Sequence, residues 1–200
     1  MKAYCLVPED LIDEITECGM DLSLGQDYSC KVTSGSGRCF TGRLNPRDYS
    51  RQELIPGTVM IKVNLSEVRA FIGEEAFLKC DGDDRVKFRL FEDSILPSDE
   101  YKPGTYRNPL CLIVNAVLPE AVETYDRFMD EAIPYETSEE LFLQCLFADA
   151  LDTGDSFRER ALITWLDILT EEGKMKKVSM GDNNVYFNPH TNRPYILRKG

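Results

Sequence analysis

The chain has 200 residues, of which 42% are hydrophobic and 29% are charged. This composition is typical of a globular protein and excludes an intrinsically disordered chain, which would contain few apolar residues. The formal net charge of −12 repels phosphate backbones and anionic lipid surfaces, so generic binding to nucleic acids or membranes is not expected.

A strand followed by a helix is predicted at the beginning of the chain. Residues 3–7 form an apolar segment typical of a short strand. Pro8 suits the start of a helix, because its missing N–H group would have no partner there in any case. Gly19 then marks the C-terminal end of this helix.

A long loop region is predicted over residues 21–56, which are rich in Gly, Ser, Asn and Asp. Within it, residues 38–41 can form one short strand and residues 45–49 a turn or a brief helix. We expect this region to carry a recognition site, because binding residues concentrate on loops that a rigid scaffold holds in place.

Two half-buried strands are predicted in the middle of the chain. Apolar and polar residues alternate over 59–65 and again over 86–90, as expected when one face of a strand is buried. Between them, Ser66 is a helix-capping residue, and we expect a short helix that ends at Gly73.

The next apolar segment, residues 111–117, is broken only by Asn115. Such a run predicts a strand that is covered on both faces. Pro119 then opens a predicted helix whose apolar stripe continues to Met129. We expect a domain boundary near residue 134, where the pattern changes.

The last third of the chain predicts two helices and a hairpin. Residues 137–140 and 156–159 both have the form of a capping box, so each begins a helix. The second helix ends at Gly173. Residues 181–184 are typical of a tight hairpin turn, and residues 194–197 can supply a further strand.

These elements predict an α+β protein with two parts. Residues 1–134 form a domain built on a small mixed sheet with flanking helices, and residues 135–200 form a helical and β-hairpin module. The order of helix, Gly173, basic strand, turn and aromatic strand in the second part resembles a winged-helix module. Residues 135–200 hold eight basic and eleven acidic residues, a net charge of −3, so this module is expected to contact protein rather than DNA.

The order of pieces in the first part resembles the layout of compact ADP-ribosyltransferase-like domains. The resemblance spans about residues 1–118 and rests on the first strand and helix, the glycine-led segment 37–41, the turn up to Tyr49 and the strand 59–65. It implies an NAD-binding unit, either active or degenerate. At Cys5 the chain departs from the family pattern, which has a ribose-binding His or Arg there.

The resemblance also implies a set of site residues. An acid near the last strands would stabilise an oxocarbenium-like centre, and arginines would pair with pyrophosphate. The catalytic candidates, chosen by location, are Glu92 and Glu100. The cofactor-binding candidates are Tyr4, Arg38, Arg43, Arg47 and Tyr49.

The seven cysteines form no CxxC pair, and His190 is the only histidine. No metal site is therefore predicted, and the thiols are expected to be free and mostly buried, as in a reducing cytoplasm. His190 lies among turn residues without the neighbours of a catalytic triad. The chain shows no signal peptide and no apolar run of about 18 residues, so a cytoplasmic protein is predicted.

Three functions remain open from the sequence. The first is an acidic cytosolic protein that binds a protein partner as a regulator or inhibitor, as a bacterial or phage-type anti-defence protein would, and needs no cofactor. The second is the ADP-ribosyltransferase-like unit, with NAD as its cofactor. The third is a winged-helix nucleic-acid binder.

Overall fold

The computed structural model describes residues 1–33, 37–50, 52–125, 137–153, 156–189 and 193–198. It divides into two compact units, Met1–Glu140 and Leu141–Gly200. The predicted boundary at residue 134, the predicted helical residues 126–129 and His190 all lie outside the described residues. The predicted α+β class is confirmed.

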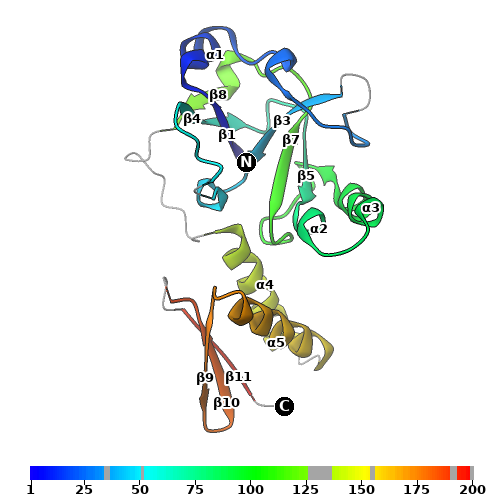
Figure 1. Cartoon of the computed structure of the whole chain (residues 1–200), viewed down its shortest axis with the longest axis vertical. Coiled ribbons are helices and arrows are strands. Elements are labelled where there is room, and N and C mark those ends of the chain that lie inside the picture. Colours follow the sequence, from blue (N-terminus) through cyan, green and yellow to red (C-terminus); the bar gives the residue numbers. More distant parts are fainter. Residues whose placement is uncertain (34–36, 51, 126–136, 154–155, 190–192, 199–200) are drawn as a thin grey trace. The chain divides into compact units, whose positions relative to one another are not determined.

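The N-terminal unit is built on an eight-stranded sheet (Figure 1). Its strands run in the order β6-β5-β7-β3-β1-β4-β8, and β2 pairs with β3. All the strand pairs are antiparallel, so the sheet is larger than the small mixed sheet predicted from the sequence and contains no parallel pair among the described residues. The strands are β1 (Lys2–Pro8), β2 (Gln26–Asp27), β3 (Arg38–Arg43), β4 (Thr58–Asn64), β5 (Ala70–Glu74), β6 (Leu96–Pro97), β7 (Pro109–Ile113) and β8 (Val122–Thr124).

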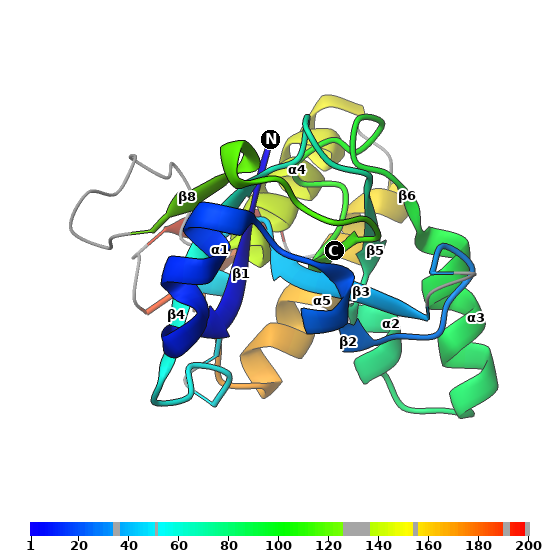
Figure 2. The ribbon, with the colours of Figure 1, turned by 90° about the horizontal axis from the view of Figure 1, so that it is seen from above.

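Both faces of this sheet are covered. Strand β7 shows this most clearly, because all five of its residues are buried. The strand predicted over 111–117 overlaps β7 only at residues 111–113, since β7 begins at Pro109 and ends at Ile113. Cys111 and Ile113 pack in a core that includes Ile15 of helix α1 (Ile12–Cys18). Leu110 and Leu112 pack in a second core with Phe91. Figure 2 shows α1 beside β1 and β4, and α3 (Asp84–Ser94) beside β5 and β6.

Helix α3 replaces the strand predicted over residues 86–90. Asp83 caps this helix by accepting hydrogen bonds from the N–H groups of Arg85 and Val86. The ring of Phe91 is fully buried and Phe88 packs beside it, a spacing of three residues that suits a helix. The alternating Val86 and Leu90 that suggested a strand are instead exposed.

Two predicted helices are strands in the structure. Strand β5 occupies part of the segment predicted as a helix from Ser66, and it pairs on both sides with β6 and β7. Gly73 does not end a helix but makes room within this strand, since a Cβ atom there would lie 2.7 Å from the ring of Phe91. After a single 3-10 turn at Pro119–Ala121, β8 pairs with β4.

The predicted long loop contains a central strand of the sheet. Strand β3 is longer than the predicted 38–41 and lies between β7 and β1. Short elements on either side occupy much of the remaining segment, namely the 3-10 turn Leu22–Leu24, strand β2, and the 3-10 turn Pro46–Asp48, which agrees with the turn predicted at 45–49. Two further short helical elements of the unit are the 3-10 turn Glu9–Leu11 and α2 (Ala76–Lys79).

The C-terminal elements agree with the predicted order of helix, helix and hairpin. They are α4 (Ser138–Thr153), α5 (Ser156–Glu171), β9 (Lys176–Met180), β10 (Asn183–Phe187) and β11 (Pro194–Arg198), the last pairing with β10 to complete a three-stranded sheet. The N–H group of Glu140 donates to the hydroxyl of Thr137, as the first capping box predicted. The core joins leucines of α5 to Tyr186, Tyr195 and Leu197 of the sheet.

All seven cysteines are free thiols. Four of them are buried (Cys5, Cys30, Cys39 and Cys111), while Cys18, Cys80 and Cys145 are exposed. Within the described residues, the helices all lack the combination of length and apolar character needed to cross a membrane.

Candidate functional site

A cavity of about 610 Å³ opens beside β1 and β3 of the N-terminal unit. We call it the polar chamber, because charged and aromatic side chains form much of its wall. Sheet strands supply Leu6, Thr41, Gly42, Arg43 and Leu110, and connecting segments supply most of the remainder, including Tyr28, Tyr49, Glu53 and Glu75. Its volume lies in the range of about 300–1,000 Å³ that is usual for small-molecule sites.

Arg43 is the central charged group of this wall. Its guanidinium donates two hydrogen bonds to the carboxylate of Glu75, at 2.7 and 3.1 Å, and one to Glu53 at 2.9 Å. Lys79 also reaches Glu75, at 2.7 Å. Two cations thus face two carboxylates, and the cluster is electrically balanced.

The pKa values of the cluster reflect these contacts. Burial would raise the pKa of Glu53, but hydrogen bonds from Arg43 and Ser50 outweigh it and lower the pKa to about 2. The same competition between burial and hydrogen bonds lowers the pKa of Glu75. For Arg43, burial would lower the pKa, but the two carboxylates raise it above its usual value. All three groups are therefore charged at neutral pH.

Tyrosine rings form the aromatic part of the wall. The guanidinium of Arg43 lies 5.8 Å from the ring centroid of Tyr49, a cation–π geometry. The hydroxyl of Tyr49 donates to the backbone carbonyl of Tyr4 at 2.7 Å. Burial raises the pKa of Tyr28 to about 12 and also raises that of Tyr49, so both phenols stay protonated at neutral pH.

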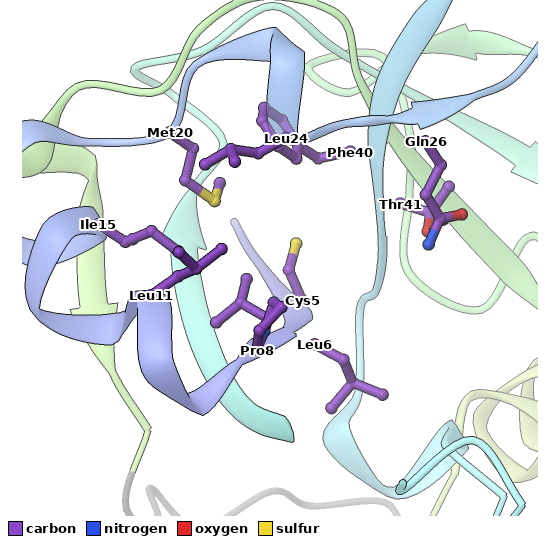
Figure 3. Close-up of a pocket in the computed structure, with 11 residues that line it drawn as sticks. Cys5, Leu6, Pro8, Leu11, Ile15, Met20, Leu24, Gln26, Phe40 and Thr41 are labelled. Atoms are coloured by element: carbon purple, nitrogen blue, oxygen red, sulfur yellow. Dashed lines mark hydrogen bonds between the residues drawn. The ribbon is translucent and has the colours of Figure 1, made fainter. Parts of the chain in front are cut away.

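A smaller cavity of about 100 Å³ adjoins the polar chamber (Figure 3). We call it the apolar slot. Leu6, Gln26 and Thr41 line both cavities, so the two cavities share part of their walls. The rest of the slot is mostly hydrophobic and is lined by Val7, Pro8, Leu11, Ile15, Met20, Leu24 and Phe40, together with Cys5.

Cys5 contributes a thiol to the slot but no reactive group. It is buried, and burial raises its pKa to about 12, so the thiol is protonated at neutral pH and is a poor nucleophile. Gly42 allows β3 to approach this position, because a Cβ atom there would lie 2.8 Å from both the Cys5 sulfur and the Tyr4 carbonyl oxygen.

The structure brings together three of the five predicted cofactor-binding residues. Tyr4 and Arg43 are paired across β1 and β3, and Tyr49 contacts both of them. Of these three, Arg43 and Tyr49 line the chamber, whereas Tyr4 does not, and its ring packs against that of Tyr125 at 5.1 Å. The other two also lie apart from the chamber wall. Arg38 forms an ion pair with Asp27 at 3.0 Å, and Arg47 is an exposed residue of the 3-10 turn.

The two predicted catalytic acids do not line either cavity. Glu92 lies on α3, where its carboxylate accepts a hydrogen bond from the backbone N–H of Lys31 at 2.7 Å. Glu100 is exposed in a turn that its N–H group closes on the carbonyl of Pro97. Neither Glu92 nor Glu100 is therefore placed to contact a ligand bound in the chamber.

Sequence reasoning missed the two acids that do reach the chamber, Glu53 and Glu75. Glu53 lies in the predicted loop and Glu75 lies two residues after Gly73, where a helix was predicted to end, so neither had a predicted partner. The sequence offered only one indication of these two acids, which is that each lies near the end of an apolar or turn segment. That signal is shared by many surface acids.

Searches against family models, curated protein sequences and solved structures each returned no match to the chain. In the part of the chain that the structure describes, histidines, cysteines and acids form no group of three or more that could hold a metal ion.

The chemistry available in the chamber is recognition by hydrogen bonds and stacking. Glu53 and Glu75 keep lone pairs that could accept hydrogen bonds from hydroxyl or amino groups of a ligand. The tyrosine rings can pack against a planar or cationic group. A pyrophosphate would have to compete with both carboxylates for Arg43, so phosphate binding by Arg43 is the least favoured of these contacts.

Proposed function

We propose that the N-terminal unit binds a nucleoside-type ligand, such as a ribose-bearing end of NAD, in the polar chamber. The observation that supports this most directly is that one cavity combines carboxylate acceptors, Glu53 and Glu75, with the rings of Tyr28 and Tyr49. Ribose hydroxyls are donors that suit the carboxylates, and a base or nicotinamide ring suits the aromatic wall.

This proposal follows the ADP-ribosyltransferase-like alternative in its degenerate form. Glu92 and Glu100 lie outside the chamber, and the acids inside it are already paired with Arg43. Cys5, at the position where the family pattern has His or Arg, is buried and uncharged. We therefore propose binding of the ligand without transfer of ADP-ribose.

Calorimetry with NAD and with adenosine tests the proposal. We expect both to bind the parent protein and to raise its melting temperature, because ligands that bind only the folded state stabilise it. Glu53→Gln should weaken binding by about 1.5–3 kcal/mol, the range for hydrogen bonds to charged groups. Glu100→Gln, a change of the same kind outside the chamber, should bind like the parent.

The binding proposal fails if neither ligand binds the folded parent protein. It also fails if Glu53→Gln remains folded by circular dichroism and binds both ligands as the parent does. Release of nicotinamide from NAD by the parent protein would instead restore the enzyme alternative and require another catalytic acid.

A second candidate function is regulation of a macromolecular partner through the acidic surface. Residues 141–200 contain eight basic and eight acidic residues, so the whole net charge of −12 falls on residues 1–140. Five exposed acids are concentrated in the 3-10 turn before α1 and in α1 itself, namely Glu9, Asp10, Asp13, Glu14 and Glu17. We call them the acidic row.

The acidic row suits a partner with a basic surface, since complementary charge speeds association and selects partners. Affinity capture from an extract, with the parent and with Glu14→Lys/Glu17→Lys, tests this function. We expect the variant to lose any partner that the row binds. If the same proteins bind the variant equally well, the row is only a solvated helix face.

A further inference from the structure

The C-terminal sheet has one covered face and one open face. In antiparallel strands, residues that lie opposite each other point to the same face. Tyr186 and Tyr195 form one such pair, and both are buried against the helices. The neighbouring row, Val178, Val185 and Ile196, therefore points to the opposite face.

We call this opposite face the open face. Its other two rows are Lys176, Phe187 and Pro194, and Met180, Asn183 and Arg198. Apolar side chains dominate it and remain accessible: Val178 is 44% exposed, Met180 63% and Ile196 53%. Contiguous exposed apolar surface of this kind commonly marks an interaction site.

The charges of the open face have one sign. Its nine residues include two cations, Lys176 and Arg198, and no carboxylate. Both cations are exposed, and no ion pair among the described residues involves either one. On the covered face, by contrast, Lys177 is paired with Asp167 at 2.7 Å. The open face therefore suits an acidic surface that also offers apolar contact.

The N-terminal unit has a surface of that description. Its acidic row lies beside the 3-10 turn Pro119–Ala121, because Gly19 at the end of α1 lies against Val117 and Pro119. Leu118, which directly precedes this turn, is 67% exposed, and Glu120 within the turn adds another exposed carboxylate. None of the acids in the row forms an ion pair with another described residue.

We infer that the open face of one copy of this chain binds the acidic row of a second copy. The inference rests on the second candidate function, since it makes the acidic row an interface and identifies its basic partner. Because the two surfaces differ, the contact is heterologous. Two such contacts made reciprocally close a dimer, and one contact per pair builds an open chain.

A charge-swap experiment tests this inference with the intact protein. The first variant, Lys176→Glu/Arg198→Glu, makes the open face acidic, and the second, Glu14→Lys/Glu17→Lys, makes the acidic row partly basic. Sedimentation over about a hundredfold range of concentration measures association, which mass action makes concentration-dependent. We expect the parent to associate. Each variant by itself should associate at least about tenfold more weakly than the parent.

The mixture of the two variants is the decisive sample. In it, the glutamates introduced on the open face can pair with the lysines introduced at positions 14 and 17 of the row, so we expect association to return when the variants are combined. The control Arg85→Glu/Arg89→Glu changes the net charge as much as the first variant does, but on exposed positions of α3, and should associate like the parent. Ile196→Ser tests the apolar part and should weaken association while both charges remain.

A parent protein that stays monomeric over the whole range overturns the inference. So does association of the parent that the mixture of variants fails to restore. Both results leave the acidic row available to a different basic protein, which affinity capture would still detect. Failure of the second candidate function is therefore distinguishable from failure of self-association.

Discussion

The two sheets of this chain differ in how completely they are covered. All five residues of β7 are buried in the N-terminal unit, whereas exposed and buried residues alternate along β11 of the C-terminal one. A sheet with two covered faces can enclose cavities, and the polar chamber and apolar slot occur there. A sheet with one covered face offers a surface instead. The proposals above follow this difference, since the small ligand is placed in a cavity of the first unit and the second unit contributes its open face to the contact between copies.

The comparison makes the buried ion-pair cluster the most sensitive point of the N-terminal unit. Arg43→Ala would leave Glu53 and Glu75 without their main partner, and breaking a buried pair in this way costs about 3–5 kcal/mol. Chemical denaturation followed by circular dichroism measures this loss. Arg38→Ala is the matched control, because its ion pair with Asp27 is exposed and is worth about 0–1 kcal/mol. If Arg43→Ala loses no more unfolding free energy than Arg38→Ala does, the cluster does not stabilise the unit.

A substitution in the core of the C-terminal unit should destabilise that unit. Leu166 is fully buried among residues of α5 and the three-stranded sheet, and Leu166→Ala should cost about 2–5 kcal/mol. If the two units fold separately, the variant unfolds residues 141–200 while the N-terminal unit keeps its stability. Hydrogen exchange resolved by residue measures both parts. Loss of protection in β7 as well would mean that the units unfold together.

Acid should weaken the N-terminal unit through Glu53, by a smaller amount. The pKa of Glu53 falls from its ordinary value of 4.5 to about 2 in the folded protein, so its stabilising contacts are fully present above pH 4.5 and are lost as the pH falls towards 2. Its side chain is 38% exposed, which limits the effect. Unfolding midpoints between pH 5 and pH 2, compared with those of Glu53→Gln, measure it. If the stability of Glu53→Gln depends on pH as that of the parent does, Glu53 does not cause the loss of stability in acid.

The parts of the fold that could be predicted are those with a local signal. Residues 111–113 of β7 were predicted because an apolar run has few other structures available to it, although the prediction continued to residue 117, beyond the end of the strand at Ile113. The C-terminal helices were predicted because capping boxes mark their first turns. The turn residues at 181–184 likewise predicted the β9–β10 hairpin. In each case the residues that specify the element lie within it or next to it.

The wrong assignments have a common cause, since long-range pairing overrode local pattern. Strand β5 begins after a residue that could cap a helix, yet β6 and β7 pair with both of its edges. In α3, three alternating apolar residues imitated a strand, while the Asp83 cap and the burial of Phe91 require a helix. The same holds for the chamber: Arg43 and Tyr49 were among the predicted site residues, but only tertiary contacts reveal Glu53 and Glu75 beside them.

The two glycines of the central strands have different consequences for second-site suppression. Each is required for space, but the neighbours differ: a Cβ atom at Gly73 would meet the ring of Phe91, whereas one at Gly42 would meet the backbone oxygen of Tyr4 as well as the Cys5 sulfur. A smaller residue at position 91 can therefore compensate for Gly73→Ala. No change of side chain moves a carbonyl oxygen of β1, so Gly42→Ala should have no single-residue suppressor in a selection for folded protein.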